Sequence, residues 1–422
     1  MADDRKPKEP QGLPEGWKWV RFKDYVYFQE GPGLTSDLFE GRSEGIPFLN
    51  IRCIQNNQLL KDKLQFVDEN IVRKHFKHFL LQENDLVVSS SGTLGRTLFI
   101  KKEHLPLLLN TSIIRMRPTN ESLSRFYLKY FIESEFFQKE IYRLSTGSAQ
   151  SNYGPSHLKR IFLILPPLSE QRKIAQILET VDNAIEKTEK IIEKYKRIKQ
   201  GLMQDLLTKG IDERGNIRSE KTHKFKDSPV GRIPEEWEVV RLGEILKYEQ
   251  PQKYIAISDK YDEKSGIPVL TAGKTFILGY VDENEGICND LPVILFDDFT
   301  TESRFVDFPF KVRSSATKIL RAKDESIDLF YVYNALKLIR LKPSSDHKRF
   351  WISEYSKLLI PLPPLSEQKR IAEILSQIDQ AIEKEEKYKE KLERLKKGLM
   401  EDLLTGKVRV NKLLEGENHE MA

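Results

Sequence analysis

Two polar segments contain the residues of this sequence whose types and spacing are best suited to binding chemistry. Residues 89–96 read Ser-Ser-Ser-Gly-Thr-Leu-Gly-Arg and follow an apolar run. Their small side chains would let backbone N–H groups approach a phosphate, and the arginine would add positive charge. The candidate contacts here are Ser91, Thr93 and Arg96. A plain hairpin turn without any ligand would explain the same residues.

The second segment, residues 145–153, reads Ser-Thr-Gly-Ser-Ala-Gln-Ser-Asn-Tyr. Glutamine and asparagine can each form two hydrogen bonds with adenine, so this composition suits the reading of bases. The candidate contacts here are Ser148, Gln150, Asn152 and Tyr153.

The corresponding place in the second half of the chain has a different sequence, His-Lys-Arg-Phe-Trp at residues 347–351. Arg349 could read a guanine and Lys348 could contact a phosphate. Two further basic residues, Lys274 and Arg304, complete the candidate set. These loops could also be exposed to solvent without contacting DNA.

Motifs of enzymes and cofactor sites are missing from the sequence. Residues 271–275 resemble the end of a phosphate-binding loop, but Pro268 stands where that motif needs glycine. No G-x-G-x-x-G follows a strand. His75 and His78 are isolated, and Asp297-Asp298 is interpreted as a turn at the end of a strand. We therefore expect no catalytic residues, no cofactor and no metal.

An internal repeat organises the whole chain. Residues 166–208 and 363–405 align without a gap at an offset of 197, and 28 of the 43 positions are identical. Each copy follows a variable block, residues 13–165 in the first half and 233–362 in the second. A polar linker, residues 209–232, joins the halves.

Both repeated segments are predicted to be long helices. Apolar residues such as Ile174, Leu178 and Val181 recur at alternating steps of four and three, which is the seam of a coiled coil. Ser169 and Ser366 are the expected N-caps. We expect the two helices to pack against each other as an antiparallel coiled coil, although two helices of an ordinary bundle would give the same pattern. Near-identical surfaces also suggest that both copies bind the same partner.

The variable blocks are predicted to be α+β, because short apolar runs alternate with helical periods. Helical periods cover residues 124–144 and 326–341. The clearest strand predictions are Asp85–Ser89, Ser112–Met116, Pro292–Phe296 and Leu358–Leu362.

The composition is that expected of a cytoplasmic protein. The net charge favours a polyanionic partner for the first block but not for the second. The 422 residues carry a net charge of +5, without a secretory signal or an apolar stretch that could span a membrane. The block 13–165 has 21 basic and 16 acidic residues, whereas 233–362 has 18 and 21. Overall attraction therefore cannot explain DNA binding by the second block, which would need a local basic face.

Taken together, these motifs resemble the specificity subunit of type I restriction–modification enzymes. The resemblance rests on the doubled Pro-Leu-Ser-Glu-Gln-(Lys/Arg)-(Lys/Arg)-Ile-Ala and the doubled Gly-Leu-Met-x-Asp-Leu-Leu-Thr. It also rests on Pro-Glu-x-Trp at the start of each block and on Thr-Gly-Ser-Ala-Gln at residues 146–150. The second block lacks the Gly-Ser-Ala-Gln loop, so DNA contacts cannot be transferred from one half to the other.

The resemblance implies a non-catalytic subunit that recognises a bipartite, asymmetric site on double-stranded DNA. Two methyltransferase (modification) subunits and the restriction subunits would dock on it. It implies two target-recognition domains separated by two long antiparallel helices. The parts would be a first recognition domain, a helical region, a linker, a second recognition domain and a helical region with a tail, over residues 1–165, 166–208, 209–232, 233–362 and 363–422. The alternative is a coiled-coil adaptor whose variable blocks bind proteins.

Overall fold

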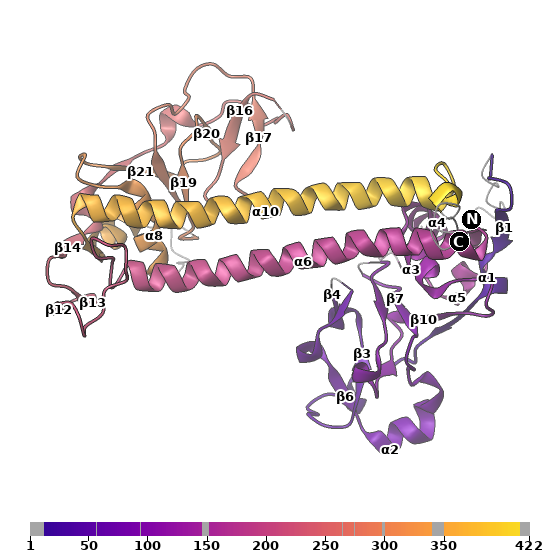
Figure 1. Ribbon diagram of the computed structural model, residues 1–422. Helices are drawn as coiled ribbons and strands as arrows, with labels where there is room; N and C mark the ends of the chain where they lie inside the picture. The colour runs from indigo at the N-terminus through magenta and orange to yellow at the C-terminus, as the bar shows by residue number, and fades with distance from the viewer. Residues whose placement is uncertain are drawn as a thin grey trace, which may run out of the picture. The chain divides into compact units, whose positions relative to one another are not determined.

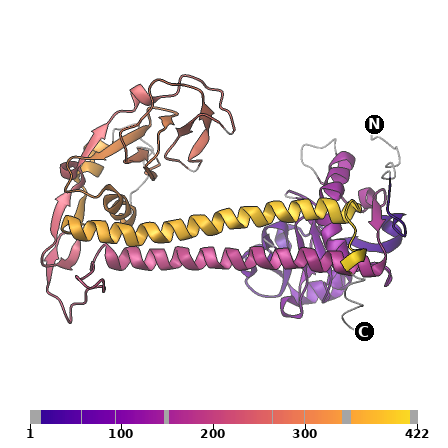
Figure 2. The same ribbon diagram turned by 45° about the horizontal axis from the view of Figure 1, so that its top comes forward.

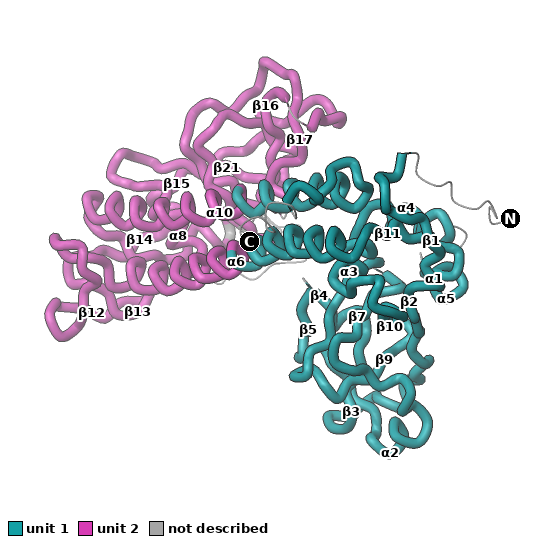
Figure 3. The backbone as a smooth tube through the Cα atoms, turned by 45° about the vertical axis from the view of Figure 1, so that its right-hand side comes forward, with its two compact units in different colours: residues 1–187, 388–422 teal, residues 188–387 magenta. Residues whose placement is uncertain are grey.

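The computed structural model describes residues 12–55, 57–92, 94–145, 152–263, 265–273, 275–297, 300–339 and 350–413. The chain divides into two compact units, shown in Figure 3. Unit 1 comprises residues 1–187 and 388–422, and unit 2 comprises residues 188–387. The boundaries fall inside the two long helices, so each unit contains one variable block, the N-terminal half of one helix and the C-terminal half of the other.

The long helices are α6 (Leu168–Leu206) and α10 (Leu365–Thr405), drawn in Figures 1 and 2. The predicted N-caps are wrong, because both helices begin one residue before the serine. The carbonyl of Pro167 already accepts a hydrogen bond from the N–H of Gln171, at 3.0 Å. Proline is tolerated there because the position before a helix needs an acceptor and no N–H donor. The serines therefore lie within the first turn.

The antiparallel packing of the helices is confirmed, and the same ion pair occurs in both units. In unit 2, Lys199 Nζ lies 2.6 Å from an oxygen of Asp379. In unit 1, Lys396 Nζ lies 2.7 Å from an oxygen of Asp182. Both lysines and both aspartates are separated by 197 residues, the offset of the repeat. The predicted seam is also present, since its residues are buried or half-buried along both helices.

Unit 1 has a four-stranded antiparallel sheet in the order β2-β10-β7-β8 and a three-stranded sheet in the order β6-β3-β9. Two short pairs, β1 with β11 and β4 with β5, complete its strands. In chain order the strands are β1 (Lys18–Arg21), β2 (Val26–Glu30), β3 (Ile46–Leu49), β4 (Ile54–Gln55), β5 (Gln58–Leu59), β6 (Gln65–Val67), β7 (Leu86–Ser89), β8 (Thr97–Phe99), β9 (Leu108–Leu109), β10 (Ile113–Pro118) and β11 (Phe162–Leu165). The strands predicted over residues 85–89 and 112–116 are confirmed.

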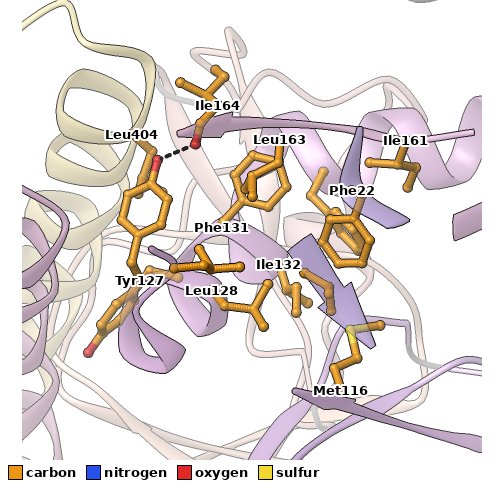
Figure 4. Packing of buried hydrophobic residues seen from close by; sticks show 14 of the residues in the cluster. Phe22, Met116, Tyr127, Leu128, Phe131, Ile132, Ile161, Leu163, Ile164 and Leu404 are labelled. Atoms are coloured by element: carbon orange, nitrogen blue, oxygen red, sulfur yellow. Dashed lines mark hydrogen bonds between the residues drawn. The ribbon is translucent and has the colours of Figure 1, made fainter. Parts of the chain in front are cut away.

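The four-stranded sheet of unit 1 is buried on both faces, which explains why its strands are runs of apolar residues. Val88 and Ile114 belong to the larger core, whereas Val87 and Ile113 belong to a second cluster. Figure 4 shows part of the larger core, where the Tyr127 hydroxyl donates to the carbonyl of Ile164 at 2.9 Å. The helices of unit 1, besides its halves of α6 and α10, are α1 (Phe22–Tyr25), α2 (Glu69–Ile71), α3 (Arg125–Glu133), α4 (Glu135–Ser145) and α5 (Pro155–Leu158).

The helix predicted over residues 124–144 is present but divided into α3 and α4. Ser134 stands at the break with extended backbone dihedrals. Its hydroxyl donates to the carbonyl of Phe131 and accepts from the N–H of Phe137, so it terminates one helix and caps the next.

Unit 2 repeats this architecture, with a sheet in the order β15-β21-β18-β19, a sheet in the order β17-β16-β20 and the pair β14 with β22. Tyr331 of α8 donates to the carbonyl of Pro361 at 2.9 Å, as Tyr127 does to Ile164 in unit 1. The strands are β12 (Phe225–Ser228), β13 (Gly231–Pro234), β14 (Glu238–Arg241), β15 (Leu246–Glu249), β16 (Ile267–Leu270), β17 (Ile277–Val281), β18 (Val293–Asp297), β19 (Ser303–Val306), β20 (Lys311–Val312), β21 (Thr317–Ala322) and β22 (Leu359–Leu362). The shorter helices are α7 (Leu242–Ile245), α8 (Leu329–Leu338) and α9 (Phe350–Ser353).

The repeated Ser-Glu-Gln at the start of each long helix has a structural role that its sequence did not predict. The side-chain oxygen of Gln171 accepts from the N–H of Ser124 at the start of α3, at 2.8 Å. Gln368 accepts from the N–H of Asp328 at the start of α8, also at 2.8 Å. Each glutamine therefore ties a long helix to the helix of its own block.

The preceding glutamate anchors the tryptophan of Pro-Glu-x-Trp and an arginine, which is buried in unit 2 and half-buried in unit 1. In unit 2, Glu367 accepts from Trp237 Nε1 and Arg218 Nη2, both at 3.1 Å. In unit 1, Glu170 accepts from Trp17 Nε1 at 3.4 Å and Arg409 Nε at 3.2 Å. Much of the identity between the two copies is therefore explained by contacts inside each unit.

The predicted linker and tail supply these arginines. Residues 209–232 include Arg218, the buried Ile211 and the hairpin strand β12. The tail supplies Arg409 and the buried Val410 to unit 1. No helix among the residues that the structure describes is long and apolar enough to cross a membrane.

Candidate nucleic-acid interface

One edge of the four-stranded sheet of unit 1 brings together the segments that the sequence singled out. Strand β2 ends at Glu30, β7 ends at Ser89 and β10 begins at Ile113. In the register of the sheet, Glu30 pairs with Ile114, and Ser89 pairs with Ile113. The loops 31–35, 90–96 and 110–112 therefore leave the same edge. We call it the loop edge of unit 1.

The second predicted segment meets the first at this edge. The N–H of Tyr153 donates to the carbonyl of Ser90 at 3.0 Å, and the N–H of Ser90 donates to the carbonyl of Ser112 at 2.9 Å. Three connections that are distant in sequence are thereby joined through their backbones. Such a rigid, joined set of loops is a suitable scaffold for binding.

Ser91 and Arg96 lie in the first of these loops, and both side chains are half-buried. The N–H of Arg96 donates to the Ser89 hydroxyl at 2.9 Å, and its Nη1 donates to the carbonyl of Ile54 at 2.9 Å. One edge of the guanidinium is therefore held by a hydrogen bond to β4. Thr93 lies outside the described residues.

Asn152 and Tyr153 differ in exposure. Asn152 is exposed at the loop edge, whereas the Tyr153 ring is buried in the larger core of unit 1. Burial raises the pKa of the Tyr153 hydroxyl. The buried tyrosine ring therefore anchors this segment to the core. A contact of its hydroxyl with DNA stays a prediction. Ser148 and Gln150 lie outside the described residues.

Unit 2 has the equivalent loop edge with different residues. Strand β15 ends at Glu249, β18 ends at Asp297 and β21 begins at Thr317. Next to it, Lys318 Nζ donates to the side-chain oxygen of Gln250 at 3.2 Å. This places a cationic group and an amide together, within a block whose net charge is negative.

Arg304 lies on β19, the outer strand of this sheet. Its Nη2 donates to the carbonyl of Gly273 at 3.4 Å, and its guanidinium carbon lies 5.8 Å from the centre of the Phe276 ring. Its Nε is buried without a hydrogen-bond partner among the described residues. Lys274, Lys348 and Arg349 lie outside the described residues, so their predicted roles stay predictions.

The sequence did not single out several polar residues that the fold brings to these edges. Asn110 and Thr111 join the loop edge of unit 1, and Gln250 and Lys318 that of unit 2. The available signal was a polar residue directly after or before an apolar strand. That signal is weak, because most strands end in polar residues.

A buried charged cluster fixes β8 of unit 1 to the long helices. Glu133 accepts from Thr97 of β8, and its carboxylate lies 3.3 Å from Lys396 Nζ. Burial opposes the charge of Asp182, but Lys129 and Lys396 outweigh it and hold the pKa of that carboxyl below its ordinary value. Every charge in the cluster has an opposite charge beside it, which suits a structural role.

No group of three or more histidines, cysteines, aspartates or glutamates that could hold a metal ion occurs in the part of the chain that the structure describes. The arrangement is therefore best described as two sheet edges that carry hydrogen-bonding and cationic groups. Edges of this kind are suited to recognition of a ligand surface.

The family model for the type I restriction modification DNA specificity domain matches residues 14–197 and 234–394. These two matches contain one variable block each, together with most of the helix that follows it. The chain therefore belongs to the type I restriction–modification DNA specificity family, and the resemblance inferred from the repeat is confirmed.

Relatives extend over almost the whole chain. A Methanocaldococcus jannaschii chain assigned as the MjaX specificity subunit of a type I restriction enzyme is 32% identical over 94% of this chain and 95% of its own length. The MjaVIII specificity subunit of the same organism is 29% identical over 96% of both chains. The Escherichia coli EcoR124I/EcoR124II specificity subunit is 48% identical over 154 residues, which are 35% of this chain and 37% of its own.

Solved structures share the fold. The S subunit of a type I restriction–modification system from M. genitalium matches with a TM-score of 0.60 and 18% identity, covering 94% of this chain and 98% of that one. A chain from a structure that describes assembly and conformational transition of the type I system matches with a TM-score of 0.53 and 18% identity, covering 94% and 100%.

Proposed function

We propose that this protein is the DNA-recognition subunit of a type I restriction–modification enzyme and that each unit reads one half of a bipartite, asymmetric site. The observation that carries the proposal is the repetition of one architecture with two different loop edges. A recognition scaffold that is used twice, with different side chains at its edge, would read two different sequences. Membership of the DNA specificity family supports the same function.

The residues at the two edges favour different bases. Unit 1 offers Asn152 and the amide of Asn110, and asparagine suits adenine. Unit 2 offers the half-buried Arg304, and arginine suits guanine or phosphate, whereas Lys318 is buried and bonded to Gln250. The proposed site is therefore asymmetric. The chemistry of methylation and cleavage would belong to the modification and restriction subunits.

Binding of duplex DNA by the full chain tests this function. We expect affinity for a pool of random duplexes to fall steeply as salt rises, because contacts with phosphates release counterions. Repeated selection from the pool should enrich two short, different sequences separated by a fixed gap. The measurement is a salt titration by fluorescence anisotropy, followed by sequencing of the bound duplexes. Binding that is absent at low salt would favour the protein-binding adaptor instead.

Exposed apolar residues on the long helices support docking of one modification subunit on each unit. Ile191 and Ile198 are exposed on the part of α6 in unit 2, one heptad apart. Tyr388 and Leu395 are exposed on the part of α10 in unit 1. The two pairs are separated by 197 residues, so they occupy the same positions of the repeat. Exposed apolar side chains at equivalent positions support docking of two copies of one partner.

Aspartate at these positions should remove the modification subunits one at a time. We expect Ile198→Asp and Leu395→Asp each to leave one modification subunit bound, because a buried unpaired charge opposes an apolar interface. The double variant should bind none. Native mass spectrometry of the mixed subunits gives the stoichiometry.

Glu193→Lys and Glu390→Lys are the matched controls. Both glutamates are exposed and equivalent in the repeat, and they lie about 200° around the helix from Ile191 and Tyr388. Two bound modification subunits on the double aspartate variant would disprove docking at this surface.

A further inference from the structure

A carboxylate that has no partner among the described residues lies at the loop edge of unit 1. Glu30, the last residue of β2, is half-buried. Its side chain has no hydrogen bond or ion pair among the residues that the structure describes. Burial raises the pKa of Glu30. A half-buried acidic group normally has a compensating donor, so this carboxylate requires an explanation.

The backbone fixes where Glu30 lies. The next residue is Gly31, where a Cβ atom would lie 2.4 Å from the backbone of Asn110. Only glycine fits there, so β2 must end against the loop 110–112. On the other side, a Cβ atom added to Gly154 would lie 3.3 Å from Glu30 Oε2. The carboxylate therefore lies beside Gly154, the residue that directly follows the second predicted segment.

The two described N–H groups that follow one another at residues 153 and 154 are used inside the protein. The Gly154 N–H donates to Nδ1 of His157 at 3.1 Å. The Tyr153 N–H donates to the carbonyl of Ser90. No residue in the described part of the chain donates to the Glu30 oxygens, so they can accept a hydrogen bond from a donor outside the protein.

The equivalent residue of unit 2 is Gln250, and it has a structural role instead. Val26 pairs with the last residue of β10 and Leu246 with the last residue of β21, so Glu30 and Gln250 each lie four residues after the start of this register. The side-chain oxygen of Gln250 accepts from Lys318 Nζ at 3.2 Å. Lys318 is the second residue of β21, whereas the second residue of β10 is the apolar Ile114. The acceptor at this position therefore has a cationic donor in unit 2, where unit 1 has isoleucine.

We infer that Glu30 is a specificity-determining residue, which accepts a hydrogen bond from the exocyclic amino group of a cytosine or an adenine in the DNA major groove. This inference rests on the proposed DNA-recognition function. A carboxylate is repelled by phosphates, so its place at a DNA-binding edge indicates contact with a base. Cytosine N4 and adenine N6 are the major-groove donors, and acidic side chains suit cytosine N4.

Sequence selection by the full chain and its variants tests this inference. We expect the wild-type protein to prefer cytosine or adenine at one position of one half-site, by about 5- to 150-fold. Glu30→Ala should lose the preference at that position and keep it at all others. Glu30→Gln should favour adenine there, because glutamine can pair with adenine N6 and N7. The measurement is sequencing of duplexes selected from a randomised pool, followed by competition binding with single-base variants.

Glu83→Ala and Glu83→Gln are the matched controls, because Glu83 is exposed at the opposite end of β7 in the same unit. They should select the same sequence as the wild type. Unchanged selection by both Glu30 variants would overturn the inference. So would loss of preference at every position by folded Glu30→Gln, because the residue would then only support the loops. A wild-type protein that selects no sequence would refute the proposed function itself.

Discussion

Replacing Glu367 by alanine should destabilise unit 2 by about 3–5 kcal/mol, because a buried arginine loses its buried counter-charge and two buried N–H groups lose their acceptor. Arg218 is only 9% exposed in its side chain, and the counter-charge that remains, Glu236 at 2.9 Å, is itself 48% exposed. Trp237 Nε1 and the N–H of Ile211 lose an acceptor at the same time. Hydrogen exchange of the full chain, resolved to peptides of unit 2, measures the change in the free energy of unfolding.

The equivalent change in unit 1 should cost less. Arg409 is 30% exposed, so water can solvate it when Glu170 is replaced by alanine. Glu373→Ala, an exposed position on α10, is the control and should change stability by less than about 0.5 kcal/mol. A loss below about 1 kcal/mol for Glu367→Ala would contradict the proposed role of this buried cluster.

Features with a strong local pattern were predictable from the sequence. The seam of α6 and α10 follows from heptad spacing, and the buried strands of both blocks follow from short apolar runs between turns. The antiparallel arrangement was predictable because the two helices are copies of each other. The N-caps were misplaced by two residues, because Pro167 and Pro364 occupy the N-cap positions and their carbonyls accept the first helical hydrogen bonds.

Contacts between distant residues were not predictable. Arg218 and Glu367 are 149 residues apart, and Arg409 and Glu170 are 239 apart. Nothing in the polar segment 209–232 distinguishes Arg218 from an exposed arginine. Glutamate in Ser-Glu-Gln likewise suggests only the first turn of a helix, where acidic residues are favoured.

The candidate interface was predicted in part. The sequence indicated two loops of unit 1, and the fold joins them through Tyr153 and Ser90. It could not show that the Tyr153 ring is buried, because aromatic residues occur both in cores and in base-stacking sites. Glu30 was overlooked because a glutamate at the end of an apolar strand is common. Only the structure shows that its carboxylate has no hydrogen bond or ion pair among the described residues.

Exchange of one variable block should change one half of the DNA site and leave the other intact. The change is replacement of residues 233–362 by the corresponding block of a relative such as the MjaVIII specificity subunit. The loop edge of unit 2 lies within this block, and that of unit 1 lies outside it. The contacts of Glu367 with Trp237 and of Gln368 with Asp328 join the block to α10. The exchanged block should therefore retain the tryptophan and the capped helix.

The measurement is the sequence that the exchanged chain selects from a pool of random duplexes, compared with that of the wild-type chain. An exchange of residues 13–165 is the reciprocal control and should alter the other half-site. Independent recognition by the two units predicts that one half-site changes completely while the bases of the other stay the same. Selection of two new half-sites, or of the original site unchanged, would contradict recognition by two independent units.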